Sequence, residues 1–105
     1  MTLIAEIEIT QGNIDNDHFR LNDAMYRFPT DLIGEPNEAS MAPREAEIDW
    51  GGPTTATTDI ESGHKFFRRR GWVREFFHLT HARPGDRVLV HEIAPYHYKV
   101  SLRKA

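Results

Sequence analysis

The chain has 105 residues, 39% of them hydrophobic and 28% charged, which is enough for one globular domain with a modest core. It has no cysteine, so disulfides, thiolate nucleophiles and cysteine-based zinc sites are excluded, and its apolar runs are too short to span a bilayer. Because the first ten residues contain acids and no basic segment, we expect no signal peptide, one domain over residues 1–105, and a cytoplasmic protein without membrane contact.

The formal net charge is only −3, but the two parts of the chain differ in sign. Residues 1–63 hold three cations against thirteen acids, and residues 64–105 hold ten cations against three acids. Such asymmetry is typical of a protein with a surface that faces a polyanion. It is equally consistent with two halves that intertwine and neutralise each other across paired strands.

The elements expected in the N-terminal third are short. Apolar and polar residues alternate through residues 3–10, which predicts a strand with one wet face. Gly, Asn and Asp dominate residues 11–17, so a loop or a turn is expected there. Asn22 or Asp23 can cap a short helix over residues 24–28, because their side chains accept hydrogen bonds from free backbone amides.

The middle of the chain carries three further strand patterns. Residues 35–44 are polar and contain two prolines, which predicts a loop before an alternating strand at residues 45–50. The β-branched residues 54–60 predict the next strand. After a polar turn at residues 61–64, residues 65–70 are expected to return as a strand, which makes a hairpin with a four-residue tip.

The last third combines a helix with two strands. Residues 72–79 have helical spacing, and the sequence at residues 83–86 is typical of a tight turn with proline and glycine. Residues 87–93 and 96–102 alternate as two final strands. The expected buried face of the helix consists of Trp72, Val73, Phe76 and Leu79.

Taken together, the patterns predict six or seven short strands and two short helices. The chain has no internal repeat and no low-complexity tract. Because short strands leave many unpaired edges, a closed or nearly closed mixed barrel is the natural arrangement.

The sequence offers little that indicates catalysis or metal binding. His78 and His81 are three residues apart, but Glu75 is the single acid near them, so a structural or surface role is favoured. The alternating acids of residues 45–49 resemble a nuclease carboxylate set, yet no lysine follows at the spacing that such sites use. We expect no active site, no metal and no cofactor.

The three consecutive arginines, Arg68 to Arg70, stand out in the basic part of the chain. On a strand, Arg68 and Arg70 would share one face with their guanidinium groups about 7 Å apart, close to the phosphate spacing of a nucleic-acid strand. The alternative is that these cations pair with acids of the protein itself. Nearby Lys65 and Arg74 favour anion binding.

Aromatic residues surround these cations. They could serve as stacking platforms for single-stranded bases, but their strand and helix spacing favours core packing. Phe19 remains open between the two roles, since it lies beside a polar loop. The aromatic residues of this part of the chain are Phe66, Phe67, Trp72, Phe76 and Phe77.

Three motifs occur in an order that resembles a known superfamily: AMYRFP at residues 24–29, RGWVREF at residues 70–76 and PGDRV at residues 84–88. From about residue 7 to residue 102, the chain resembles the B3-like DNA-binding pseudobarrel. This superfamily includes plant transcription-factor domains and the effector or recognition domains of some bacterial restriction endonucleases. The resemblance implies a mostly β, α+β fold, a seven-stranded open pseudobarrel with two short helices.

The resemblance also implies a function, which is non-catalytic, sequence-specific binding to double-stranded DNA. Members grip the major groove with two arms, which here would be residues 13–20 and the hairpin around residues 61–65. The side chains that would read bases are Asn13, Asn16, His18, Arg20, Glu61, Ser62, His64 and Lys65. The side chains that would hold phosphates are Arg68, Arg69, Arg70 and Arg74.

Two departures from this pattern concern charge and length. Asp15 and Asp17 lie within the first arm and Glu61 within the second, where phosphates would repel them. Either they accept from cytosine amino groups, or the DNA surface has moved or been lost. A restriction endonuclease pairs this fold with a catalytic domain, so a nuclease domain or subunit is an expected partner. The oligomeric state is not predicted.

Two other functions remain as alternatives to duplex binding. The first is a protein-interaction or ligand-binding β-barrel of the same fold that uses another surface. The second is binding of single strands or RNA through Phe19 and Phe66.

Overall fold

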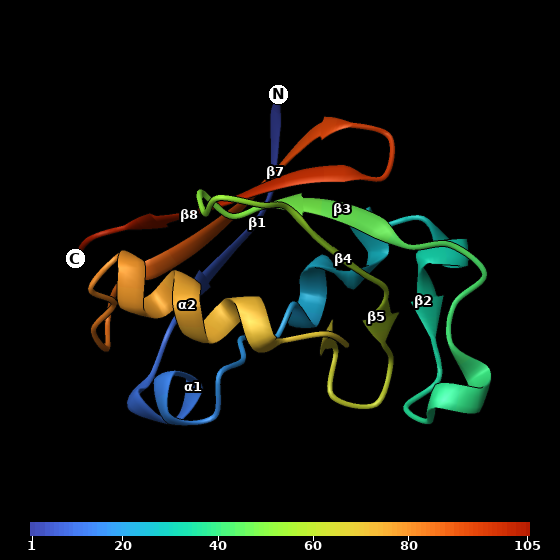
Figure 1. The fold of residues 1–105 in the computed structure, drawn as a ribbon, viewed down its shortest axis with the longest axis horizontal. Helices are drawn as coiled ribbons and strands as arrows, with labels where there is room; N and C mark the ends of the chain where they lie inside the picture. Colours follow the sequence, from blue (N-terminus) through green and yellow to red (C-terminus); the bar gives the residue numbers. More distant parts are fainter.

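The computed structural model describes residues 1–105 apart from the side chain of Glu38, and along this chain eight strands form two sheets (Figure 1). The strands of the five-stranded sheet, in spatial order, are β1 (Thr2–Glu8), β7 (Arg87–Ala94), β8 (His97–Arg103), β3 (Ala46–Asp49) and β4 (Ala56–Thr58). Those of the three-stranded sheet are β2 (Ile33–Gly34), β5 (Ile60–Glu61) and β6 (Phe66–Phe67). The helices are α1 (Gln11–Asp15), α2 (Gly71–Leu79) and 3₁₀ helices at Asn22–Arg27, Thr30–Leu32 and Glu38–Ser40.

This arrangement confirms an α+β fold in which strands dominate. The expected strand count is wrong, because eight strands in two sheets replace the seven strands of an open pseudobarrel. The difference arises in the middle of the chain, where β2 was not expected and the run expected as one strand at residues 54–60 is interrupted at Asp59. β4 before this residue joins the larger sheet, and β5 after it joins the smaller one.

The larger sheet is antiparallel except where β3 runs parallel to β8. Its central hairpin, β7 and β8, confirms the two strands expected near the C-terminus. Alternation along both strands sends one set of side chains inward, and β3 contributes to the same layer. The inward, buried side chains of these strands are Ala46, Ile48, Val88, Val90, Tyr98 and Val100.

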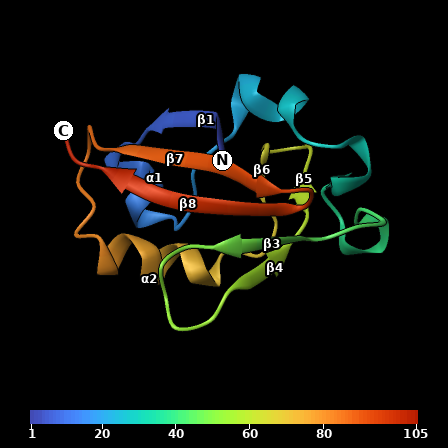
Figure 2. The same ribbon diagram turned by 90° about the horizontal axis from the view of Figure 1, so that it is seen from above.

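Helix α2 packs beneath the inner face of the larger sheet (Figures 1 and 2). Its buried side chains are Trp72, Val73, Phe76 and Phe77. The expectation for Leu79 is wrong, because its exposed fraction is 55%, and Phe77 takes its place in the core. The buried stripe runs along i, i+1, i+4 and i+5, so Leu79 lies at its margin in the last turn. Along the described chain, neither α-helix has the length and apolarity needed to cross a bilayer.

The segment expected as a loop at residues 11–17 begins with helix α1. Thr10 is its N-cap, and its Oγ1 accepts a hydrogen bond from the Asn13 backbone at 3.2 Å. The Asn13 Oδ1 accepts in return from the Thr10 backbone at 3.0 Å. This reciprocal pair is a capping box in which Asn takes the place of the usual Glu or Gln.

The short helix expected after Asn22 is a 3₁₀ helix, and neither of the two candidate caps acts as one. Its N-cap position is Leu21, and no side chain caps it. Asn22 has a φ of 46°, so the chain enters this helix through a left-handed residue. Such a conformation is tolerated by asparagine better than by most residues.

Candidate nucleic-acid interface

Two segments expected as separate DNA-binding arms lie next to each other. The hairpin expected after residue 60 is confirmed, with the loop Ser62–Lys65 between β5 and β6. The backbone carbonyl of Lys65 accepts a hydrogen bond from the Leu21 backbone at 2.7 Å. The end of the first segment, residues 18–20, is thereby tied to the hairpin loop although about 45 residues separate them in sequence.

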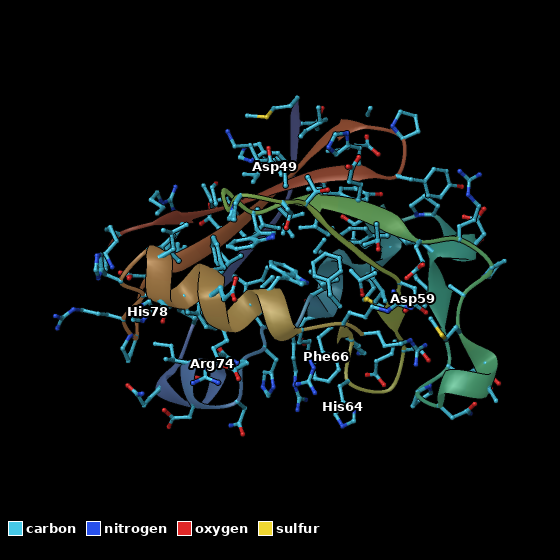
Figure 3. All side chains as sticks on the ribbon, viewed as in Figure 1. Asp49, Asp59, His64, Phe66, Arg74 and His78 are labelled. Atoms are coloured by element: carbon cyan, nitrogen blue, oxygen red, sulfur yellow. The ribbon has the colours of Figure 1, made fainter. Side chains whose placement is uncertain are left out.

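Phe66 is the centre of the side chains that these segments bring together. The His64 ring stacks on it with centroids 5.0 Å apart and an angle of 13° between the rings. The His18 ring lies 5.4 Å away with a tilt of 39°, and the Arg70 guanidinium carbon lies 4.4 Å from the Phe66 centroid. We call these four residues the Phe66 cluster. Figure 3 places His64 and Phe66 on the side of the molecule opposite the larger sheet.

The Phe66 cluster is electropositive. The pKa of His18 is lowered, first by partial burial and then by the charges of Arg70, Arg20 and His64, and Asp17 opposes these effects only in part. Nη1 of Arg70 lies 3.5 Å from Nδ1 of His18, so a neutral imidazole can accept from the guanidinium. Arg20 of the first arm and Arg70 of the arginine run therefore both act on His18.

His64 and Glu61 form a pair within the hairpin. Nδ1 of His64 lies 3.1 Å from Oε1 of Glu61, and the backbone N–H of His64 donates to the same oxygen. The His64 side chain is 58% exposed, whereas that of Glu61 is 5% exposed. Glu61 was expected to read bases, but its burial removes it from the surface and makes it a support for His64.

Arg68 is turned inward and does not join the Phe66 cluster. Its Nε donates to Asp59 Oδ1 at 2.7 Å, and its terminal nitrogens donate to the carbonyls of Glu35 and Pro36 at 2.5 and 3.0 Å. Its side chain is 9% exposed and that of Asp59 is fully buried. The structural alternative, pairing with an acid of the protein itself, describes Arg68. The sequence did not single out Asp59, and its one signal was an acid at the end of a β-branched run.

The other two arginines of the run point to different surroundings. β6 ends before the run, so the expected strand face with Arg68 and Arg70 side by side does not form. Arg69 is 54% exposed and lies 3.3 Å from Glu45, while its carbonyl accepts from the Trp72 indole at 2.7 Å. Of the three arginines, Arg70 is the one that belongs to the Phe66 cluster.

The two asparagines expected to read bases serve helix α1. Asn13 completes the capping box with Thr10, and the Asn16 side-chain amide donates to the carbonyl of Gly12 at 2.8 Å. Each contact uses one polar atom of the amide, Asn13 Oδ1 and Asn16 Nδ2, so the helix restrains both side chains. Apart from Glu61, the other side chains expected to read bases are His18, Arg20, Ser62, His64 and Lys65.

Arg74 extends the same side of the molecule toward α1 (Figure 3). It lines an open groove of about 1320 Å³ that follows α2. Acids and histidines line the groove together with Arg74, namely Asp15, Asp17, Glu75, His78 and His81. Among the described side chains, no three His, Asp or Glu residues lie close enough together to hold a metal ion.

Comparison of the chain with protein-family models, with curated proteins and with solved structures finds no match. The site is therefore interpreted through its own chemistry. It is a basic, partly aromatic surface formed by the loop Ser62–Lys65, by residues 18–20 before the first 3₁₀ helix, and by Arg70 at the start of α2.

Proposed function

We propose that the chain is a non-catalytic domain that binds double-stranded DNA sequence-specifically through the Phe66 cluster and the hairpin loop Ser62–Lys65. The observation that carries the proposal is the convergence of two arginines, Arg20 and Arg70, on His18 beside the Phe66 ring, across segments that are distant in sequence. A local concentration of cations attracts the DNA backbone even when the net charge of the protein is negative. Protruding polar side chains beside it can reach base edges.

The B3-like relationship belongs to the same proposal. Three features support it: a short helix that ends before Pro29, a helix that starts at Gly71, and a tight turn before β7. Within this proposal, the chain is the target-recognition part of a restriction endonuclease in the cytoplasm, and its partner is a nuclease domain or subunit.

The proposal is tested by selection of the chain on a random duplex library. We expect an enriched short motif and no cleavage of the DNA. Binding should weaken steeply between 50 and 200 mM salt, because salt screens the contacts to the DNA phosphates. Failure to bind any duplex, or affinity that is unchanged at about 0.5 M salt, would count against duplex recognition. Competition with the matching single strand separates the alternative of single-strand binding.

A protein-interaction or ligand-binding function is the second candidate. It is favoured by the groove along α2 and by the pairing of two arginines of the run, Arg68 with Asp59 and Arg69 with Glu45. Replacing Arg70 distinguishes the two functions, because only DNA binding depends on the Phe66 cluster. Unchanged DNA affinity in Arg70→Ala would favour the second candidate.

A further inference from the structure

His64 is an exposed side chain with a fixed orientation. Its ring is 58% exposed, yet it stacks on Phe66 and its Nδ1 is bound by Glu61. Exposed side chains normally retain rotamer freedom, and ordering one costs free energy. The hairpin therefore presents one preoriented imidazole to the solvent, a property expected of a group that contacts a ligand.

The partner of Nδ1 determines the tautomer of His64. An ionised carboxylate can only accept hydrogen bonds, so Nδ1 of His64 must carry the proton that points at Glu61. In a neutral imidazole the other nitrogen, Nε2, is then a hydrogen-bond acceptor. The backbone N–H of His64 donates to the same Glu61 oxygen, which fixes the carboxylate against the loop.

We infer that His64 determines specificity by accepting a hydrogen bond from the exocyclic amino group of a cytosine or an adenine, and that Glu61 is its positioning residue. The inference rests on the proposed duplex binding and deepens it. In the major groove, cytosine and adenine present amino donors, whereas guanine and thymine present acceptors at the corresponding positions. An acceptor held at Nε2 therefore discriminates between these two classes of base.

The groups around His64 complete this arrangement. Arg70 and His18 contact Phe66, and Arg20 lies close enough to act on His18. The positive charges of Arg20 and Arg70 suit the DNA backbone, whereas Glu61 is buried behind His64 and withdrawn from it. Charge and base recognition thus fall on different side chains of one surface.

The test is library selection at pH 8. For the wild-type chain we expect one position at which cytosine or adenine is enriched. In His64→Ala that position becomes degenerate while the rest of the motif persists, and affinity for the best site falls about fivefold, the effect of one hydrogen bond. The salt dependence stays unchanged, since no phosphate contact is lost.

Glu61→Gln tests the positioning role. The glutamine amide can donate to Nδ1, which permits the opposite tautomer, so we expect the same position to accept guanine or thymine as well. The ¹⁵N–¹H spectrum of His64 gives a readout without DNA: a protonated Nδ1 in the wild type and a mixture of tautomers in Glu61→Gln. A thermal melt of each variant establishes that it folds.

His97→Ala is the matched control, because His97 also lies beside a carboxylate, with Nε2 3.7 Å from Glu47, but is on β8 in the larger sheet. It is expected to leave the motif unchanged. An enriched motif that His64→Ala leaves intact at every position overturns the inference and keeps the proposed function. Enrichment of guanine or thymine at the position that depends on His64 also overturns it. Absence of any duplex binding overturns both.

Discussion

Arg68 and Arg70 are two residues apart, and the structure gives them opposite surroundings. Arg68 is held by a buried carboxylate and two backbone carbonyls, so its charge is neutralised within the fold. Arg70 is half-buried over the buried ring of Phe66, and its guanidinium meets the His18 ring and not a carboxylate. The comparison teaches that a run of cations is not one binding element, because the chain turns between them and each side chain meets a different layer.

The largest expected effect is the loss of stability in Arg68→Ala. The substitution leaves the Asp59 carboxylate buried without its cation, and removing one partner of a buried ion pair costs about 3–5 kcal/mol. Chemical denaturation measures the change in the free energy of unfolding. At denaturant concentrations below the unfolding midpoint, the folded variant is expected to bind DNA with nearly wild-type affinity. A variant that is as stable as the wild type but does not bind DNA would show that Arg68 contacts DNA and does not stabilise the fold.

The next largest effect is expected in the free energy of unfolding at acidic pH. Burial raises the pKa of Asp59, but hydrogen bonds and charge from Arg68 and the Ala42 amide outweigh it and lower the pKa below its usual value. Hydrogen bonds from Lys104 and from two backbone amides lower the pKa of Asp86 to about 2. Both carboxylates are therefore expected to stabilise the fold above about pH 4 and to lose this contribution as the pH falls toward 2.

Asp86→Asn isolates the second of these carboxylates. The C-terminal residues Lys104 and Ala105 donate to Asp86 at 2.6 and 2.9 Å, so the substitution weakens the attachment of the C-terminus. We expect the melting temperature of the variant to fall below that of the wild type at pH 7 and to match it at pH 2. An equal difference at both pH values would contradict the ion-pair explanation.

Arg70→Ala is expected to act on binding and not on stability. Loss of one phosphate contact reduces the salt slope of DNA binding by about 1, and loss of the partly exposed cation–π contact costs roughly 0.5–1 kcal/mol of stability. Arg103→Ala is the control, because Arg103 is a surface arginine that lies on β8 beside Glu6, away from the Phe66 cluster. Equal salt slopes in the two variants would exclude Arg70 from the interface.

The smallest expected effect is that of Arg69→Ala on stability. Arg69 and Glu45 are both partly exposed at 3.3 Å, and a surface ion pair of this kind contributes about 0–1 kcal/mol. Denaturation of the variant measures this contribution beside that of Arg68→Ala. A loss of stability as large as that in Arg68→Ala would show that the difference in burial does not determine how much each arginine stabilises the fold.

Periodicity in the sequence was sufficient to predict β1, β3, β7, β8 and α2, but not the order in which these strands pair in the sheet. The β7–β8 hairpin and the loop Ser62–Lys65 follow directly from alternation and turn residues, because local patterns determine both. The exposure of Leu79 and the capping box of α1 were not predicted. Spacing alone shows neither where a buried stripe ends nor that Asn13 can complete a cap.

The candidate site was predicted in part. The sequence brought His18, His64 and Arg70 into consideration, but it assigned the first two to base reading and the third to phosphate binding without joining them. Their contacts depend on Phe66, which is buried as expected but lies beneath these side chains and outside the hydrophobic core cluster. The inward turn of Arg68 depended on a long-range partner, and no local pattern carries that information.

Mapping of the interface by NMR tests the central claim most directly. The ¹⁵N–¹H spectrum of the wild-type chain is recorded with increasing amounts of a selected duplex. We expect the largest shifts at residues 18–20, at the loop Ser62–Lys65 and at Arg70, and small shifts along β7 and β8. Shifts concentrated on the larger sheet, or no shifts with any duplex, would contradict DNA binding through the Phe66 cluster.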